Sequence, residues 1–163
     1  MASSLYAEIF REPSRQEIRD FLLGIPLFTG LKRSEVGHLA RLMFKRTFKE
    51  GEIIFVEKDI GSAMYIIMNG KVSILKQAGK KVKPVAHLSN GSFFGEMALL
   101  TDAQRSATAR ADAKTELLVF FKKDLEHVLE EDPAMGLKLM RKLAEVLAQR
   151  LQHAITQLEG SGR

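Results

Sequence analysis

The chain has 163 residues, of which 45% are hydrophobic and 28% charged, a balance typical of globular domains and not of disordered or collagen-like chains. It contains no cysteine, which excludes disulfides, thiolate metal sites and cysteine nucleophiles. No apolar run approaches the roughly 20 residues that span a bilayer, and the N-terminus lacks the basic start and apolar stretch of a secretory signal. We therefore expect a cytoplasmic protein without a membrane span.

The net charge of +5 is unevenly distributed. Thirteen residues without a single acid contain five lysines, namely Lys71, Lys76, Lys80, Lys81 and Lys83. A basic surface attracts nucleic acid, anionic membranes or acidic partners. No aromatic residue is interleaved with these lysines, as it would be in a surface for single-stranded nucleic acid. We favour a solvated surface over a DNA-binding one.

The first 45 residues predict helices. Ser14 with Glu17 three residues later forms a capping-box pattern, and Gly24 and Pro26 end the helix that it begins. A second helix is expected to begin at Ser34.

Residues 47–121 carry short apolar and β-branched runs separated by glycines, a pattern typical of a sandwich or barrel. Asn69-Gly70 predicts a hairpin turn, because both residues tolerate positive φ, and Pro84 predicts an edge strand or the start of a strand. The predicted strands are Ile53–Val56, Met64–Met68, Val72–Leu75, Val82–Leu88, Ser106–Ala111 and Leu117–Phe121.

The C-terminal part predicts a helix over Lys122–Glu131 and a longer one opening at Asp132-Pro133, since proline is favoured in the first turn. Apolar residues then recur every three or four positions, as in a heptad repeat. They are Leu137, Met140, Ala144, Leu147, Leu151, Ala154 and Leu158. This stripe either packs on the β structure as a lid or pairs with a second chain, and we favour a homodimer that buries Leu151 and Leu158.

The segment GSFFGEMALLTDAQRSAT, residues 91–108, carries the residues suited to ligand chemistry. Gly95 permits a tight turn and a close approach to the backbone, and Glu96–Leu100 favours one helical turn whose first N–H groups attract anions. Arg105 offers a planar fork of donors that matches phosphate oxygens, whereas the Glu96 carboxylate suits a sugar hydroxyl. Together they indicate a sugar phosphate with one negative charge.

These residues resemble the phosphate-binding cassette of cyclic-nucleotide-binding domains. The match consists of FGEMALL at 94–100 followed by RSAT at 105–108, with Gln104 where the family often has proline. The resemblance extends over roughly residues 25–155. It includes IPLF at 25–28, KEGE at 49–52, Gly61 with Met64-Tyr65, and Asn69-Gly70 with Val72.

The resemblance implies a mainly β fold with flanking helices. The core would be a double-stranded β-helix, a jelly-roll-like β-roll of eight strands, with N-terminal helices and a long C-terminal helix. The implied segments are an N-terminal helical part over 1–24, the cyclic-nucleotide-binding roll over 25–132, and a lid or dimerisation helix over 133–159.

The resemblance also implies ligand-binding roles. Glu96 would bind the ribose 2′-hydroxyl and Arg105 the cyclic phosphate, while Ile74 and Val85 would wall the base. Backbone amides would complete the phosphate cradle at Gly95, Glu96, Met97, Ala98, Ser106 and Ala107. The alternative is a structural ion pair between Glu96 and Arg105 in a domain that no longer binds ligand.

In the family, a threonine directly after the arginine tends to accompany a preference for cyclic GMP. This position holds Ser106 here, which resembles bacterial cyclic AMP receptors. We therefore expect cyclic AMP, with cyclic GMP as the alternative ligand. A polar residue of the long helix would face the base, and the candidates are Arg141, Gln149, His153 and Thr156.

The expected function is a cyclic nucleotide sensor that is not an enzyme. Its four histidines are scattered and predict no metal site, and the chain has neither a nucleophile elbow nor a Walker A loop. Binding would draw the helices of residues 122–158 toward the roll about a hinge near Asp132-Pro133. Only five residues follow Leu158, so no DNA-binding domain is expected, and the output would be a dimer or an unknown protein effector. The alternative is a ligand-independent scaffold with a vestigial cassette.

Overall fold

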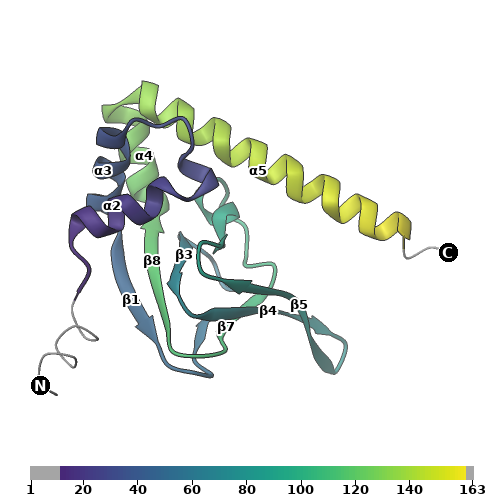
Figure 1. Cartoon of the computed structure of the whole chain (residues 1–163). Coiled ribbons are helices and arrows are strands. Elements are labelled where there is room, and N and C mark those ends of the chain that lie inside the picture. The colour runs from purple at the N-terminus through teal and green to yellow at the C-terminus, as the bar shows by residue number, and fades with distance from the viewer. Residues whose placement is uncertain (1–11, 161–163) are drawn as a thin grey trace, which may run out of the picture.

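The computed structural model describes residues 12–160, which form two four-stranded antiparallel sheets flanked by helices (Figure 1). Three helices of at least nine residues precede or follow the strands, and a fourth, much longer one ends the described chain. The helices are α2 (Arg15–Leu23), α3 (Arg33–Leu42), α4 (Lys122–Glu131) and α5 (Pro133–Gly160), with short 3-10 turns η1 (Pro26–Phe28) and η2 (Glu96–Leu99). The predicted mainly β roll with flanking helices is confirmed.

The eight strands pair in the orders β1-β8-β3-β6 and β2-β7-β4-β5. They are β1 (Phe44–Phe48), β2 (Ile53–Phe55), β3 (Ala63–Asn69), β4 (Lys71–Ala78), β5 (Lys81–Ser89), β6 (Phe93–Phe94), β7 (Thr108–Ala111) and β8 (Thr115–Phe121). β1 has no counterpart among the predicted strands, because its sequence FKRTF is half polar and lies on a largely exposed edge.

Strand β8 separates two hydrophobic cores, because successive side chains of a strand point to opposite faces. Leu118 and Phe120 pack with the helices, together with Met64 and Ile66 of β3. Leu117 packs between the two sheets. The larger core also takes in Ile18 and Leu22 of α2 and Met135, Leu139 and Leu143 of α5, so α2 and the first half of α5 are anchored on the first sheet.

Local signals in the sequence set the positions of the helices and turns. Ser14 caps α2 and completes the predicted capping box with Glu17. Gly70 adopts a φ of 118° between β3 and β4, as the hairpin motif predicts, and an added Cβ would lie 2.4 Å from Thr115 Oγ1. Pro84 lies on β5, which is an edge strand, as the missing N–H of proline requires.

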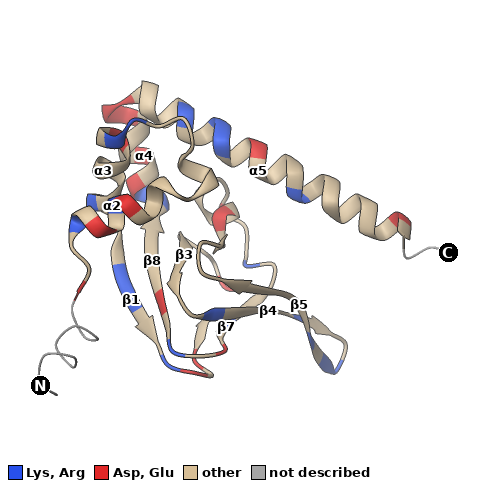
Figure 2. Ribbon diagram, viewed as in Figure 1, with Lys and Arg blue, Asp and Glu red and all other residues tan. Residues whose placement is uncertain are grey.

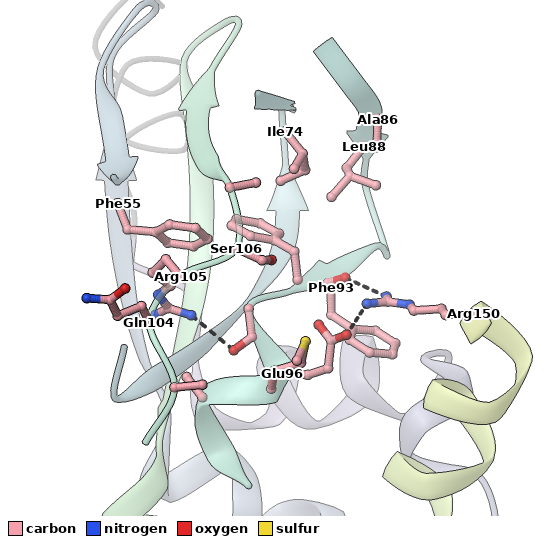
Figure 3. Close-up of a pocket in the computed structure, with 16 residues that line it drawn as sticks. Phe55, Ile74, Ala86, Leu88, Phe93, Glu96, Gln104, Arg105, Ser106 and Arg150 are labelled. Carbon is pink, nitrogen blue, oxygen red and sulfur yellow. Dashed lines mark hydrogen bonds and ion pairs between the residues drawn. The ribbon is translucent and has the colours of Figure 1, made fainter. Parts of the chain in front are cut away.

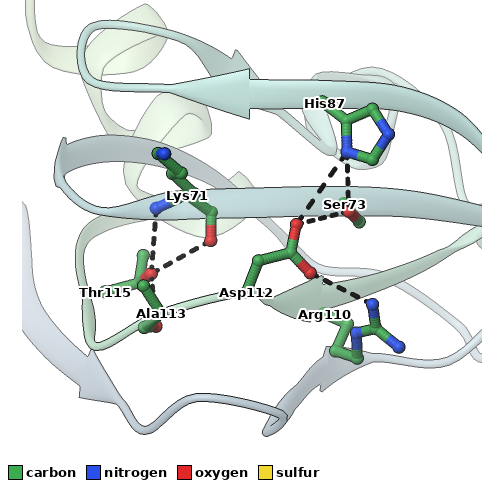
Figure 4. Close-up of polar contacts among 7 residues, drawn as sticks. All are labelled: Lys71, Ser73, His87, Arg110, Asp112, Ala113 and Thr115. Carbon is green, nitrogen blue, oxygen red and sulfur yellow. Dashed lines mark hydrogen bonds and ion pairs between the residues drawn. The ribbon is translucent and has the colours of Figure 1, made fainter.

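The outer face of the second sheet carries a polar network (Figure 4). Ser73 of β4 hydrogen bonds to His87 of β5 at 2.9 Å and to Asp112, which follows β7. Arg110 donates to the other oxygen of Asp112 at 3.1 Å. Hydrogen bonding by Ser73 and Arg110 lowers the pKa of Asp112 against the opposing effect of burial. The network therefore fixes the register of three neighbouring strands on the face that is turned away from the interior.

The apolar packing of helix α5 on the rest of the fold involves only its first half, and its second half projects from the molecule (Figure 1). The buried face consists of Met135, Leu139 and Leu143. Most of the predicted heptad stripe lies elsewhere on the helix, with Leu137, Leu151 and Leu158 between 63% and 75% exposed. The stripe is therefore not a lid on the roll. None of the described helices is long and apolar enough to cross a bilayer.

The packing of β8 predicts a specific stability difference. Leu118 is fully buried in the larger core, so Leu118→Ala should lower the free energy of unfolding by about 3 kcal/mol, through lost burial and a residual cavity. Ile60→Ala is the control, because Ile60 is 78% exposed and an exposed substitution changes stability by only about 0.5 kcal/mol. Urea denaturation measures both, and equal losses would contradict the assignment of the core.

Candidate functional site

The segment that follows β6 makes a sharp turn into the short helix η2. Gly95 supplies this turn with a left-handed φ of 75°, which glycine adopts without the steric cost that other residues meet. The Gly95 Cα also lies close to Arg105, since an added Cβ would be 2.7 Å from Arg105 Nη1. Glycine is therefore required both for the backbone conformation and for the approach of the arginine.

Arg105 is buried, with 8% of its surface exposed. Its Nη2 donates to the Ala63 carbonyl at 2.7 Å and its Nη1 to the Gly95 carbonyl at 3.1 Å, while the guanidinium lies 4.0 Å above the centre of the Phe55 ring. Burial lowers the pKa of Arg105, opposed by the nearby Tyr65 and Glu96. Within residues 12–160 no carboxylate lies within ion-pair distance of it.

The backbone holds Arg105 in place. Its N–H donates to the Asp59 carbonyl at 2.7 Å, and its own carbonyl accepts from the Lys58 N–H at 2.8 Å. Gly61 passes directly beside the side chain, where a Cβ would lie 2.5 Å from Arg105 Nε. The backbone thus holds the guanidinium in one place, and a group that is already ordered loses little conformational entropy when it binds a partner.

Glu96, the first residue of η2, is 5% exposed and its partner comes from the distal part of α5. Arg150 Nη1 forms an ion pair with Glu96 Oε1, while Nη2 donates to the Phe93 carbonyl at 2.9 Å. The Arg150 guanidinium also lies 4.8 Å from the centre of the Phe93 ring. The alternative ion pair between Glu96 and Arg105 is therefore not formed, because Glu96 pairs with Arg150 instead.

These groups surround a cavity of about 350 Å³ (Figure 3). Arg105 and Gln104 lie on one side of it, Glu96 and Arg150 on the other, and the strands β4 and β5 contribute apolar residues. A mostly apolar hollow with a few fixed polar groups is typical of a small-molecule site. The described residues hold no group of three or more His, Asp or Glu that could bind a metal ion.

Comparisons with known proteins agree with this geometry. Residues 45–132 match the model of the cyclic nucleotide-binding domain. The chain belongs to the cyclic nucleotide-binding domain family. The match covers both sheets and most of the cavity, and it ends where α5 begins.

The relatives of this cyclic nucleotide-binding domain include receptors and channels. The "Cyclic AMP receptor protein" of Thermus thermophilus is 36% identical over 137 residues, covering 83% of the chain and 62% of that protein. A crystal structure of the Thermus thermophilus catabolite activator protein has a TM-score of 0.74 and covers 82% of the chain and 62% of that structure. A putative potassium channel protein of Rhodopseudomonas palustris is 31% identical, covering 87% of the chain and 36% of that protein. The chain thus spans only part of each relative.

The structure brings together eight of the nine residues expected to bind ligand. They line one cavity and are Ile74, Gly95, Glu96, Met97, Ala98, Arg105, Ser106 and Ala107. Val85 is a correction: it is 60% exposed and does not line the cavity. Ile74 pairs with Ala86 and Leu75 with Pro84, so a bulge at Val85 shifts the alternation of β5 and turns Ala86 and Leu88 inward instead.

Of the further residues that line the cavity, three have roles that were not predicted. Phe55 forms the surface on which Arg105 stacks, Ala86 replaces Val85 as a wall, and Arg150 is the residue of α5 that reaches the cavity. None of the four candidates on the long helix, Arg141, Gln149, His153 and Thr156, lines it. The buried residue Leu143 carries the signal for Arg150, because position 150 lies about two helical turns further along and therefore on nearly the same face of the helix.

Two glycine substitutions test the crowding around Arg105. Gly95→Ala and Gly79→Ala both place a side chain at positive φ, 75° and 62°, which costs about 1 to 2 kcal/mol for a left-handed residue. Only the Cβ at position 95 meets a neighbour, since nothing lies within 4 Å of one at position 79. Urea denaturation should therefore show the larger loss of stability for Gly95→Ala, and equal losses would mean that Arg105 moves aside without cost.

Proposed function

We propose that this domain is a cyclic nucleotide sensor that binds cyclic AMP in the cavity, and that its role is regulatory and not catalytic. The observation that carries the proposal is the buried Arg105 guanidinium without a carboxylate partner. A buried charge is costly unless it is paired. A singly charged cyclic phosphate beside the free edge of the guanidinium supplies the missing partner and leaves the carbonyl hydrogen bonds intact.

Glu96 is suited to the ribose. A carboxylate accepts several hydrogen bonds, so Glu96 can keep its ion pair with Arg150 while it accepts one from the 2′-hydroxyl. Its ion-pair partner among the described residues is Arg150 and not Arg105. The two charges therefore have separate tasks, one toward the phosphate and one toward the sugar.

The apolar wall is suited to a purine. Ile74, Ala86 and Leu88 line the cavity, and contacts of this kind hold a flat base without selecting one. Among the residues that line the cavity, Ser106 is the one with a hydroxyl side chain. We propose cyclic AMP as the preferred ligand on the likeness of this serine to that of bacterial cyclic AMP receptors, with cyclic GMP as the weaker ligand.

Signal transfer would run through α5. Arg150, in the distal half of the helix, contacts Glu96 and Phe93 at the cavity. The helix begins at Pro133, directly after Asp132 ends α4. Ligand that strengthens the Glu96–Arg150 contact would favour the docked arrangement of α5 over an open one, which is a population shift. The break at Asp132-Pro133 would act as the hinge.

The exposed leucines of α5 support a homodimer as the readout. Leu151 and Leu158 lie on the heptad stripe and are 63% and 75% exposed, and a stripe with this period is the seam of a coiled coil. The same stripe also favours the alternative of a ligand-independent scaffold. A cytoplasmic location and a further protein effector remain part of the proposal.

The first experiment is calorimetric titration of nucleotide-stripped protein with cyclic AMP and cyclic GMP. We expect saturable 1:1 binding, tighter for cyclic AMP. Arg105→Ala should weaken binding by about 2 to 3 kcal/mol, because it removes a charged hydrogen-bond partner of the phosphate. Arg105→Lys keeps the charge but loses the fork, and should weaken binding by less.

Arg110→Ala is the matched control, because Arg110 pairs with Asp112 outside the cavity. It should bind like the original protein. Folding of each variant is checked by thermal melting. No heat with either nucleotide on a folded sample would reject the sensor in favour of the scaffold, and unchanged binding by Arg105→Ala would reject the phosphate site.

Substitutions on the stripe test the dimer. Leu151→Glu with Leu158→Glu should abolish dimers in analytical ultracentrifugation, because like charges would face each other across an apolar seam. Gln149→Glu with Thr156→Glu adds the same charge on another face of the helix and should leave the dimer intact. Dimers that form equally with and without cyclic AMP would support the scaffold, and a monomeric original protein under both conditions would contradict the dimer.

A further inference from the structure

The β4–β5 hairpin extends beyond the sheet to which it belongs. β7 pairs with β4 only at residues 72–75, whereas β4 and β5 pair with each other as far as Ala78 and Lys81. Residues 76–83 therefore form a two-stranded ribbon to which no third strand of the described chain pairs, and the ribbon projects from the roll (Figure 1). Both of its faces are open to solvent.

One face of this ribbon continues the wall of the cavity. Ile74 lines the cavity, and Lys76 lies two residues further along the same strand, hence on the same face. Lys83 is the cross-strand partner of Lys76, and Lys81 is the partner of Ala78, so both share that face. Ser73 and His87 lie on the opposite face, in the polar network of Figure 4.

This lysine face, made up of Lys76, Lys81 and Lys83, lies beside the opening of the cavity. Lys76 Nζ donates to the carbonyl of Ser106, which lines the cavity, at 2.5 Å. Lys76 also pairs with Glu57 at 2.7 Å, and this hydrogen bond lowers the pKa of Glu57. Glu57 therefore neutralises Lys76, and Lys76 also holds the backbone at Ser106.

Lys81 and Lys83 are exposed, and no ion pair neutralises either of them within the described residues. No Asp or Glu lies between Asp59 and Glu96 in the sequence, so the ribbon contains no acid. Figure 2 shows its projecting end in blue without red nearby on the hairpin. The ribbon thus presents an uncompensated positive potential next to the cavity.

We infer that the lysine face is a capture surface that speeds the association of the anionic nucleotide with the cavity. The inference rests on the proposed function. Lys81 and Lys83 attract the ligand through solvent during its approach and make no contact with it once bound. Their contribution therefore falls on the association rate constant and not on the dissociation rate constant, as is general for charges outside a contact.

The expected size follows from electrostatic steering. Clefts lined by one sign of charge raise association rates by about 10- to 1,000-fold in strong cases. Two lysines and one ligand charge make a modest case, for which we expect roughly a three- to tenfold effect at low ionic strength. The Debye length falls from about 30 Å at 0.01 M salt to about 3 Å at 1 M, so the effect should disappear at high salt.

Stopped-flow mixing with cyclic AMP that carries an uncharged fluorophore on its purine tests the inference. Lys81→Gln with Lys83→Gln should slow association at low salt and leave dissociation, measured by displacement with excess cyclic AMP, unchanged. Lys81→Glu with Lys83→Glu should slow it further. This graded response to charge distinguishes steering from a structural disturbance of the hairpin, which would not follow the sign of the charge or vanish in salt.

Lys49→Gln with Lys114→Gln is the matched control. These lysines lie in turns at the other end of β4, where the Gly51 N–H bonds to Ala111 and the Asp112 N–H to Lys71. The control removes the same net charge and should associate at close to the original rate. An equal slowing by the control, or no slowing by either ribbon variant, overturns the capture surface while leaving the proposed function intact. A lack of any binding by the original protein overturns both.

Discussion

The arrangement of the site depends on one buried cation. Arg105 is buried and contacts two carbonyl oxygens and an aromatic ring. These contacts restrict the backbone conformation and the side chains of the surrounding residues. The carbonyl of Gly95 is presented only because the turn after β6 is left-handed, and Gly61 leaves room beside Arg105 Nε. The glycine frame of the sequence is thus the steric consequence of placing a large charged group inside a small roll.

The long helix α5 has one face in contact with the roll and its cavity and another face exposed to solvent. Its first half is fixed by Leu139 and Leu143 in the same core as the first sheet. About two helical turns beyond Leu143, Arg150 forms an ion pair with Glu96. Leu151, the next residue, belongs to the exposed stripe. The residue that pairs with Glu96 and a residue of the proposed dimer stripe are therefore adjacent on the helix.

The sequence predicts those features whose signals are local. The cassette residues, the capping box at Ser14 and the turn at Gly70 each occupy a few consecutive positions, and the structure contains all of them. Val85 was assigned to the wrong face because a bulge in β5 depends on the pairing with β4, which alternation along one strand does not reveal. Arg150 was not predicted because the heptad stripe is regular in the sequence, whereas the buried face of the helix is defined only by its packing on the roll.

The buried cation also links binding to stability. A charge without an ionised partner in a low-dielectric site weakens the fold, and here carbonyl dipoles and the Phe55 ring compensate it in part. An anion that completes the compensation binds the folded state alone, and so stabilises it by an amount that grows with ligand concentration over Kd. A neutral molecule of the same shape would leave the cost of burying Arg105 unrelieved, so this arginine would favour anions in the cavity.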